Sequence, residues 1–454
     1  MTMFDLALRS LRFRAGGFLA SFLALFLGAT ILMAFASLLE TGTGDGVPAA
    51  SRETLFTMTG VVGGIGLVIV VFAVTSTLTL SVRQRAAELA LLKNVGATPA
   101  QIGRMIVGET AIVAVAAALA AIPPALLVGR GVLELLAATD QVAAAVAYRF
   151  GPIAVGSGLG ITFVAATLAA ALTARAAGRM GAKESLLAAS LEDGRLGRKR
   201  RVAAVLFLAV GVNLGVVTAT VFHGKGYDAM QTAGQASIWA SIGLALLAPV
   251  LVRAGIGVLA GPVGRAFGAD GYLAVLNLRQ RPQQLAGVVM PIVLFTGIAT
   301  GTLYMQAIEN RATAAAGVVK STEQRNIETL NYVVVGMIVL FAAIMLINTL
   351  VAATTYRGRE FGQQRLVGST PRQVLLMVGI EGIVLTATGV LFGSLASLVT
   401  VVPYSIARRS AVVPNAPLGI WLGIVAVAAL LTLGASLGAT RRAIRTPAVE
   451  AVAP

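Results

Sequence analysis

Two groups of charged residues in this chain share the same order and spacing. Arg85 and Glu88 are followed by Lys93, and the same order of charges returns 272 residues later. Charges so placed can form ion pairs inside the chain or contact a protein partner. Other reactive groups are scarce: the sequence has no cysteine, one histidine (His223), which cannot form a metal site alone, and no Gly-x-x-x-x-Gly-Lys-Ser/Thr nucleotide loop. We therefore expect a chain that is not an enzyme and binds no cofactor of its own.

The match between the two segments continues beyond the charges. A glycine, a Thr-Pro pair, a glutamine and a later glutamate recur at the same spacing. The repeated residues are Arg85, Glu88, Val95, Gly96, Thr98, Pro99, Gln101, Met105 and Glu109 in the first segment, and Arg357, Glu360, Val367, Gly368, Thr370, Pro371, Gln373, Met377 and Glu381 in the second, with Lys93 matching Arg365 in charge.

Each segment predicts a sharp corner between two helices. In the first, a helix over residues 85–95 has an acid near its start and a base near its end, as the helix dipole favours. Gly96 permits the positive φ that ends a helix. Thr98-Pro99-Ala100-Gln101 then reads as a capping box with proline at the first helical position. We call residues 85–101 the first elbow and residues 357–373 the second elbow.

The elbows allow two interpretations. They either only connect helices or form a contact surface for a partner. The second is favoured, because the elbows remain similar while the apolar stretches around them have diverged in detail.

The composition predicts a helical membrane protein. Of 454 residues, 57% are hydrophobic and 12% are charged, and the mean hydropathy is +0.87, whereas a soluble domain has roughly 25% charged residues. Stretches of about 20 apolar residues can cross a bilayer as helices. We therefore expect an all-α polytopic membrane protein with ten transmembrane helices, near residues 17–39, 60–82, 105–128, 152–174, 202–222, 236–260, 285–306, 331–355, 373–397 and 418–439.

The basic residues predict the orientation of the chain. With a cytoplasmic N-terminus, 26 of the 35 Lys and Arg residues fall on the cytoplasmic side, in agreement with the positive-inside rule. Both termini are thus expected in the cytoplasm. The net charge of +16 is explained by these segments, which also attract anionic membrane lipids, so no nucleic-acid partner is expected.

The repeat divides the chain into two like parts. Residues 1–190 and 271–454 each hold four spans, and residues 191–270 hold two linker spans and a basic segment. Six spans separate the starts of the two repeats, so both cross the membrane in the same direction. Both elbows are therefore expected on the cytoplasmic side.

The two elbows resemble those of a known family. Residues 85–99 with Glu109, and the weaker copy from Tyr356, are similar to the FtsX-like permeases. These are membrane subunits of bacterial ABC transporters such as the macrolide exporters and the bacitracin-resistance permeases. The resemblance implies an inner-membrane permease that couples ATP hydrolysis by a separate ATPase to export, or outer-leaflet handling, of a hydrophobic, peptide or lipid-like substrate. Two ATPase copies are expected per chain, and these would hold the ATP and Mg²⁺.

The resemblance also implies roles for individual residues. In this family the loop between the second and third spans of each repeat carries the coupling helix that docks on the ATPase. Gly358 and Gly362 should weaken that helix in the second copy by about 1 kcal/mol each. The implied coupling residues are Arg85, Glu88, Leu89, Leu92, Lys93 and Gly96, with Arg357, Glu360, Arg365 and Gly368 in the second elbow; the implied capping and transmission residues are Thr98, Pro99, Gln101 and Glu109, with Thr370, Pro371, Gln373 and Glu381.

Glu109 and Glu381 leave a choice open. Each either binds a basic residue of its elbow, tying the elbow to the span, or reaches water or a neighbouring helix at the membrane interface. Ionisable side chains at mid-bilayer, which an ion-driven transporter is expected to carry, are almost absent from the sequence. This scarcity favours an ATPase-driven mechanism.

The interval between the seventh and eighth spans bears on the substrate. Residues 307–330 are polar and predict a helical extension with a turn, whereas the bacitracin-resistance permeases carry a large outer domain there. A peptide-antibiotic substrate is therefore not favoured. The alternative function is a membrane sensor or mechanical regulator that uses the same ATPase but moves no solute.

Overall fold

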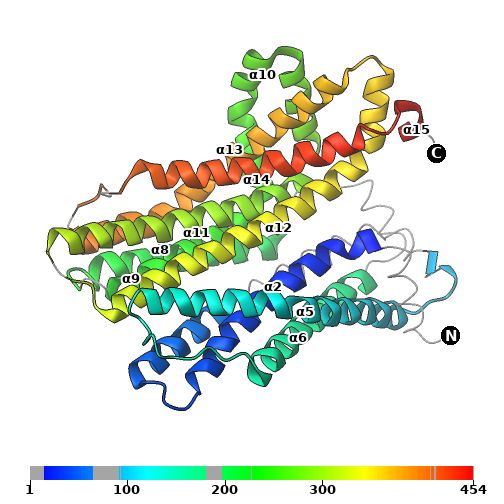
Figure 1. The fold of residues 1–454 in the computed structure, drawn as a ribbon. Helices are drawn as coiled ribbons and strands as arrows, with labels where there is room; N and C mark the ends of the chain where they lie inside the picture. The colour runs from blue at the N-terminus through cyan, green and yellow to red at the C-terminus, as the bar shows by residue number, and fades with distance from the viewer. Residues whose placement is uncertain are drawn as a thin grey trace. The chain divides into compact units, whose positions relative to one another are not determined.

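The computed structural model describes residues 15–64, 91–92, 94–179, 197–225, 228–317, 319–409, 411–413 and 416–452. Across these residues the chain is helical and has no β-strand, which confirms the all-α prediction. The helices, labelled as in Figure 1, are α2 (Ala15–Gly42), α5 (Pro99–Ala138), α6 (Pro152–Arg179), α8 (Arg198–Thr220), α9 (Ala229–Leu246), α10 (Ala248–Gln280), α11 (Pro282–Ala315), α12 (Thr322–Leu366), α13 (Pro371–Arg409), α14 (Leu418–Ala443) and α15 (Ala448–Val452).

Within the described part of the chain, nine helices are long and apolar enough to cross a membrane. The chain is therefore a multi-pass membrane protein. The expected span at residues 60–82 lies mostly outside the described residues. The nine helices are α2, α5, α6, α8, α10, α11, α12, α13 and α14.

The expected span at residues 236–260 differs from the prediction, because it is not one helix. α9 ends at Leu246, and Leu247 (φ −86°, ψ 4°) separates it from α10. Pro249 lies in the first turn of α10. Proline lacks an amide N–H, which would have no partner in the first turn of a helix, so Pro249 suits the start of a new helix at this point.

α10 itself has two arms that meet at Gly268, whose φ is 54°. Figure 1 shows the two arms side by side. A Cβ added to Gly271 would lie 2.5 Å from the carbonyl oxygen of Val263, so only glycine allows the arms to approach this closely. The second arm leads directly into α11.

Contacts along the backbone group the chain into two compact units. Compact unit 1 comprises residues 1–192 and 320–337, and compact unit 2 comprises residues 193–319 and 338–454. α12 contributes its first turns to unit 1 and the rest to unit 2.

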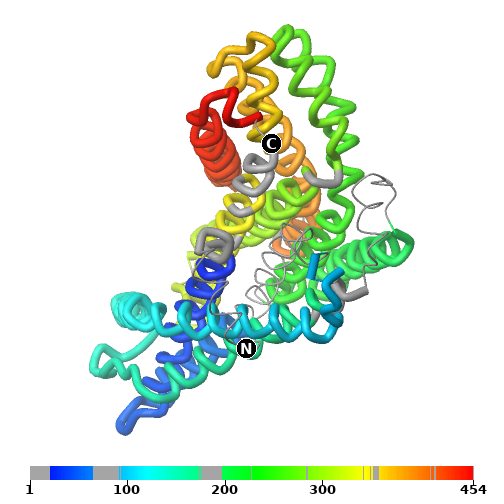
Figure 2. The backbone as a smooth tube through the Cα atoms, turned by 90° about the vertical axis from the view of Figure 1, so that its right-hand side faces the viewer, coloured from blue at the N-terminus to red at the C-terminus, as the bar shows by residue number. Residues whose placement is uncertain are grey.

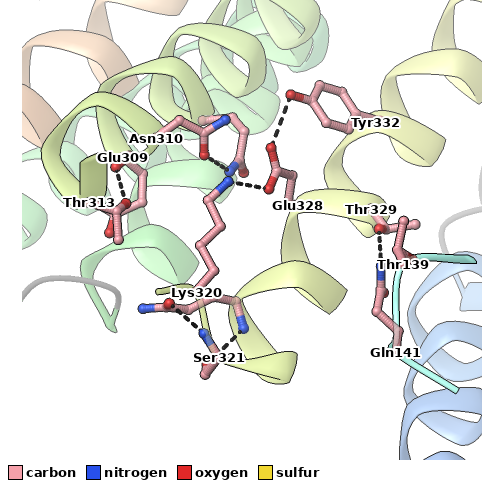
Figure 3. Close-up of polar contacts among 12 residues, drawn as sticks. Thr139, Gln141, Glu309, Asn310, Thr313, Lys320, Ser321, Glu328, Thr329 and Tyr332 are labelled. Atoms are coloured by element: carbon pink, nitrogen blue, oxygen red, sulfur yellow. Dashed lines mark hydrogen bonds and ion pairs between the residues drawn. The ribbon is translucent and has the colours of Figure 1, made fainter. Parts of the chain in front are cut away.

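In compact unit 1, α2 packs against α5 and α6. The carboxylate of Glu40, at the end of α2, accepts the backbone N–H groups of Gly151 (2.8 Å) and Ala154 (2.9 Å) and so caps the start of α6. The first turns of α12 join this unit through the amide of Gln141, which donates to the hydroxyl of Thr329 at 2.9 Å (Figure 3). Polar contacts thus fix the ends of these helices.

In compact unit 2, α11 packs along α13. A Cβ added to Gly389 would lie 2.5 Å from Ile292, and one added to Gly393 would lie 2.6 Å from Thr296. Glycines at such contacts let membrane helices pack closely in the absence of a hydrophobic driving force. α11 and α13 therefore form a tightly packed pair in the middle of this unit.

The chain between α11 and α12 is short. α11 ends at Ala315 and α12 begins at Thr322. Ser321 and Gln324 form a capping box at the start of α12, with hydrogen bonds of 3.1 and 3.3 Å, and Lys320 binds Glu328 at 2.6 Å (Figure 3). The predicted helical extension with a turn is confirmed.

Candidate functional site: the helical elbows

The second elbow has the corner geometry that the sequence predicts. Gly368, just after α12, has a φ of 108°. The backbone N–H groups of Gly368 and Ser369 donate to the carbonyl oxygens of Arg365 (3.1 Å) and Gln364 (3.0 Å). This pattern is a Schellman C-cap, which ends a helix with its last carbonyl groups satisfied.

The two elbows share the same capping box. The N–H of Gln373 donates to the Thr370 hydroxyl at 3.3 Å, and the Thr370 N–H donates to the Gln373 amide oxygen at 2.8 Å. The same two bonds join Thr98 and Gln101 at 3.3 and 2.8 Å. Gly96 has a φ of 100°. The predicted glycine stop and capping box are confirmed in both copies, with α5 and α13 starting at the expected prolines.

The first elbow is described only in part. Leu92 accepts the backbone N–H of Ala97 at 2.9 Å, as in a Schellman C-cap. The remaining residues predicted for coupling in this elbow lie outside the described residues; they are Arg85, Glu88, Leu89 and Lys93.

A buried ion pair joins the second elbow to the span that follows it. The guanidinium of Arg357 on α12 donates to both carboxylate oxygens of Glu381 on α13, at 2.5 and 3.0 Å. The two side chains are only 13% and 6% exposed. Of the two interpretations open for Glu381, the structure confirms binding to a basic residue of its elbow. Such a bidentate pair fixes both distance and orientation.

Further charges extend this pair into a network. Glu360 lies 3.5 Å from Arg357 and 2.7 Å from Arg281, at the end of α10. Burial alone would lower the pKa of the Arg357 guanidinium, but the carboxylates of Glu381 and Glu360 outweigh burial and raise this pKa above its ordinary value. Arg357 therefore stays charged. The amide of Asn277 donates to Glu381 at 3.2 Å, so α10 contributes two polar side chains to the network.

An apolar cluster lies beside the network. Phe361 on α12 is buried against Met377 and Val378 on α13 and against Ala274 on α10. The Arg357 guanidinium lies 5.0 Å from the centre of the Phe361 ring, a cation–π contact. The second elbow is thus held by both apolar packing and ion pairs.

The C-terminal segment covers one face of the second elbow. The guanidinium of Arg365 donates to the backbone carbonyl oxygens of Ile444 (3.0 Å) and Thr446 (2.8 Å). A Cβ added to Gly362 would lie 2.9 Å from Val452 on α15. Figures 1 and 2 both show this segment, in red, beside the turn between α12 and α13. Gly362, predicted from the sequence to weaken this helix, therefore makes room for α15.

The tip of each elbow, which is the valine just before its glycine, is exposed. Val367 is 91% exposed, and its counterpart in the first elbow, Val95, is 88% exposed. Leu366 and Leu91 beside them are exposed as well. Glu109, the counterpart of Glu381, is buried. Each elbow therefore combines an apolar exposed tip with a buried acid on the following helix.

A second buried acid lies at the other end of α13. Glu309 on α11 accepts a hydrogen bond from the Tyr404 hydroxyl at 2.7 Å and one from the Arg408 guanidinium at 2.8 Å, both on α13. Glu309 and Tyr404 are buried. Reasoning from the sequence missed this cluster, and also missed Arg281 and Asn277. Glu309 and Arg408 lie 99 positions apart, and no motif in the sequence links them.

A family comparison agrees with this geometry. Residues 60–181 and 332–448 both match the family model of the FtsX-like permease C-terminal domain. The two segments are 122 and 117 residues long, more than half of the chain together, and each contains one elbow. Among curated proteins, none matches the chain. The chain therefore belongs to the FtsX-like permease family and carries the family's domain twice.

Proposed function

We propose that this chain is the membrane subunit of an ABC transporter, and that its elbows receive the movement of a separate ATPase. Membership of the FtsX-like permease family supports a role of this type. The observation that carries the proposal is the second elbow, a corner capped on both sides that is joined by a buried ion pair to the next membrane helix. A corner held in this way can transmit a push to α13 without bending.

Contact and transmission fall to different residues in this proposal. Arg357 and Glu360 bind partners inside the chain, so we assign them to transmission. The exposed valines at the tips, Val95 and Val367, are assigned to contact, because burying a valine in an apolar cleft is worth about 1.5–3 kcal/mol. One ATPase on each elbow gives two copies per chain.

α13 is the element that carries the movement. Glu381 and Arg408 are 27 positions apart on this helix, about 40 Å at 1.5 Å per residue. The first is ion-paired to α12 and the second to α11. A displacement of the second elbow thus reaches the far end of compact unit 2 through one continuous helix.

The substrate that suits this arrangement is hydrophobic, such as a lipid-like molecule or an apolar peptide, exported or handled in the outer leaflet. Only residues 316–321 separate α11 from α12. A substrate therefore meets no large capture domain between these two helices, and membrane-embedded surfaces are left to bind it.

The test is the recovery of the ATPase with tagged chain from native membranes. The double variant Val95→Glu and Val367→Glu should lower recovery of an ABC-type ATPase about tenfold or more, because charged tips cannot enter an apolar cleft. Val319→Glu is the matched control: Val319 is 92% exposed, in the turn between α11 and α12. Replacing Glu88 and Lys93 with alanine should either weaken recovery or uncouple ATP hydrolysis from transport. Undiminished recovery with both tips changed would refute the proposal.

A further inference from the structure

A groove opens in compact unit 2 between α12, α14 and α15. Its volume is about 1110 Å³. One wall is a stripe of α14 residues four positions apart, Leu430, Gly434, Gly438 and Arg442, and Arg359 on α12 faces it across the groove. Residues at this spacing lie on one face of a helix, so the stripe forms a continuous strip of groove wall.

The groove is apolar along most of its length and basic at one end. From Leu430 to Arg442 the stripe covers twelve positions, about 18 Å of helix. This is slightly more than half the thickness of a bilayer core of about 30 Å. The two arginines lie at the end near the second elbow, where α12 and α14 leave the apolar region. The groove therefore has the length and polarity of one leaflet.

The two arginines at this end have no partner within the described residues. The side chains of Arg359 and Arg442 are exposed and make no ion pair or hydrogen bond there, although the neighbouring Arg357 and Arg365 bind carboxylates or carbonyl oxygens of the chain. Two unpaired cations beside an apolar groove attract an anion that carries an apolar tail.

The glycines of the stripe are open towards the groove. A Cβ added to Gly434 or Gly438 would meet no atom of the chain within 4 Å. Elsewhere in this unit, glycines such as Gly389 and Gly393 lie against a neighbouring helix. The chain therefore leaves space at Gly434 and Gly438, on the groove wall, for another molecule.

We propose that this groove binds one anionic phospholipid from the leaflet on the side of the second elbow. One acyl chain lies along the stripe, over Gly434 and Gly438, and the phosphate lies between Arg359 and Arg442. The lipid links α12 to α14 beside the elbow. This inference requires only that the chain spans a membrane, so it stands or falls independently of the ATPase.

The first arm of the test fills the groove. Delipidated chain in detergent micelles is titrated with phosphatidylglycerol, and bound lipids are counted by native mass spectrometry. Gly434→Leu with Gly438→Leu should bind one tightly held lipid fewer than wild type. Gly419→Leu with Gly423→Leu is the matched control, because these glycines lie on the same helix, away from the groove, and also have no atom within 4 Å. Equal lipid counts in the two double variants would overturn the proposal.

The second arm tests the headgroup. Arg359→Gln with Arg442→Gln should weaken phosphatidylglycerol binding about 10- to 30-fold, whereas Arg441→Gln, on the same helix outside the groove lining, should leave it unchanged. Phosphatidylethanolamine with the same acyl chains should bind wild type more weakly than phosphatidylglycerol. Equal binding of the two lipids, or no effect of the arginine pair, would refute an anionic ligand. Thermal unfolding of each variant checks that it is folded.

Discussion

Removing both members of the buried pair of Arg357 and Glu381 should destabilise the chain far less than the sum of the two single removals. Taking away one member of a buried ion pair typically destabilises a protein by about 3–5 kcal/mol. For Arg357→Met we expect a loss of about 3 kcal/mol in unfolding free energy, the low end of that range, because the amide of Asn277 still donates to Glu381 at 3.2 Å. For Glu381→Met we expect about 2 kcal/mol, because Glu360 remains 3.5 Å from Arg357. The double variant should lose only about 2 kcal/mol, since it leaves neither charge unpaired.

These values predict a coupling energy of about 3 kcal/mol between the two residues, at the upper end of measured double-mutant cycles. The assay is denaturant unfolding of the purified chain and its variants in detergent micelles. The matched control is the pair Arg130 and Glu134, 2.9 Å apart but about two-thirds exposed, for which about 0.3–0.5 kcal/mol is expected. Effects of Arg357→Met and Glu381→Met that add within about 0.5 kcal/mol would show that the pair does not join the elbow to α13.

Three further predictions concern other parts of the chain. Gly362→Ala should be neutral or destabilising, because its Cβ would lie 2.9 Å from α15. Gly358→Ala has open space around its Cβ and should stabilise the helix by up to about 1 kcal/mol. Equal shifts of the melting temperature in the two variants would contradict this packing. Glu309→Gln should lower the unfolding free energy by about 2–3 kcal/mol, because it removes the charged acceptor of the hydrogen bonds from Tyr404 and Arg408. An unchanged unfolding free energy would argue against a structural role for Glu309. Arg85 and Glu109 are the repeat counterparts of Arg357 and Glu381. A double-mutant cycle on them should therefore give a coupling energy of the same sign as in the second elbow. A coupling energy near zero would show that the two repeats differ here.

The elbows were predictable because their determinants are local. A glycine that must take a positive φ and a Thr-Pro-x-Gln capping box each act over four residues. The structure has both features in both copies, at Gly96 and Gly368 and at Thr98 and Thr370. The repeat spacing made the prediction stronger, since two segments with the same local signals fold in the same way.

Contacts between distant segments were harder to predict. For Glu381 the sequence leaves open whether it binds a basic residue of its elbow or reaches water or a neighbouring helix. It does not indicate Arg281 or Asn277 at all, because no local pattern marks a residue about 80 to 100 positions away. The cluster of Glu309 was missed because its residues look like ordinary interfacial polar groups in the sequence. The break at Leu247 was missed because hydropathy continues across it, and only Pro249 marks it.

The central claim, that the elbows are the cytoplasmic contact points of an external ATPase, can be tested with single cysteines. The chain has no cysteine, so Val367→Cys and Val319→Cys each introduce the only thiol. In inside-out vesicles a membrane-impermeant thiol reagent should label Val367→Cys and not Val319→Cys, and bound ATPase should block the labelling. In right-side-out vesicles the pattern should reverse. Labelling of Val367→Cys from the outside, or labelling that the ATPase leaves unchanged, would contradict the account.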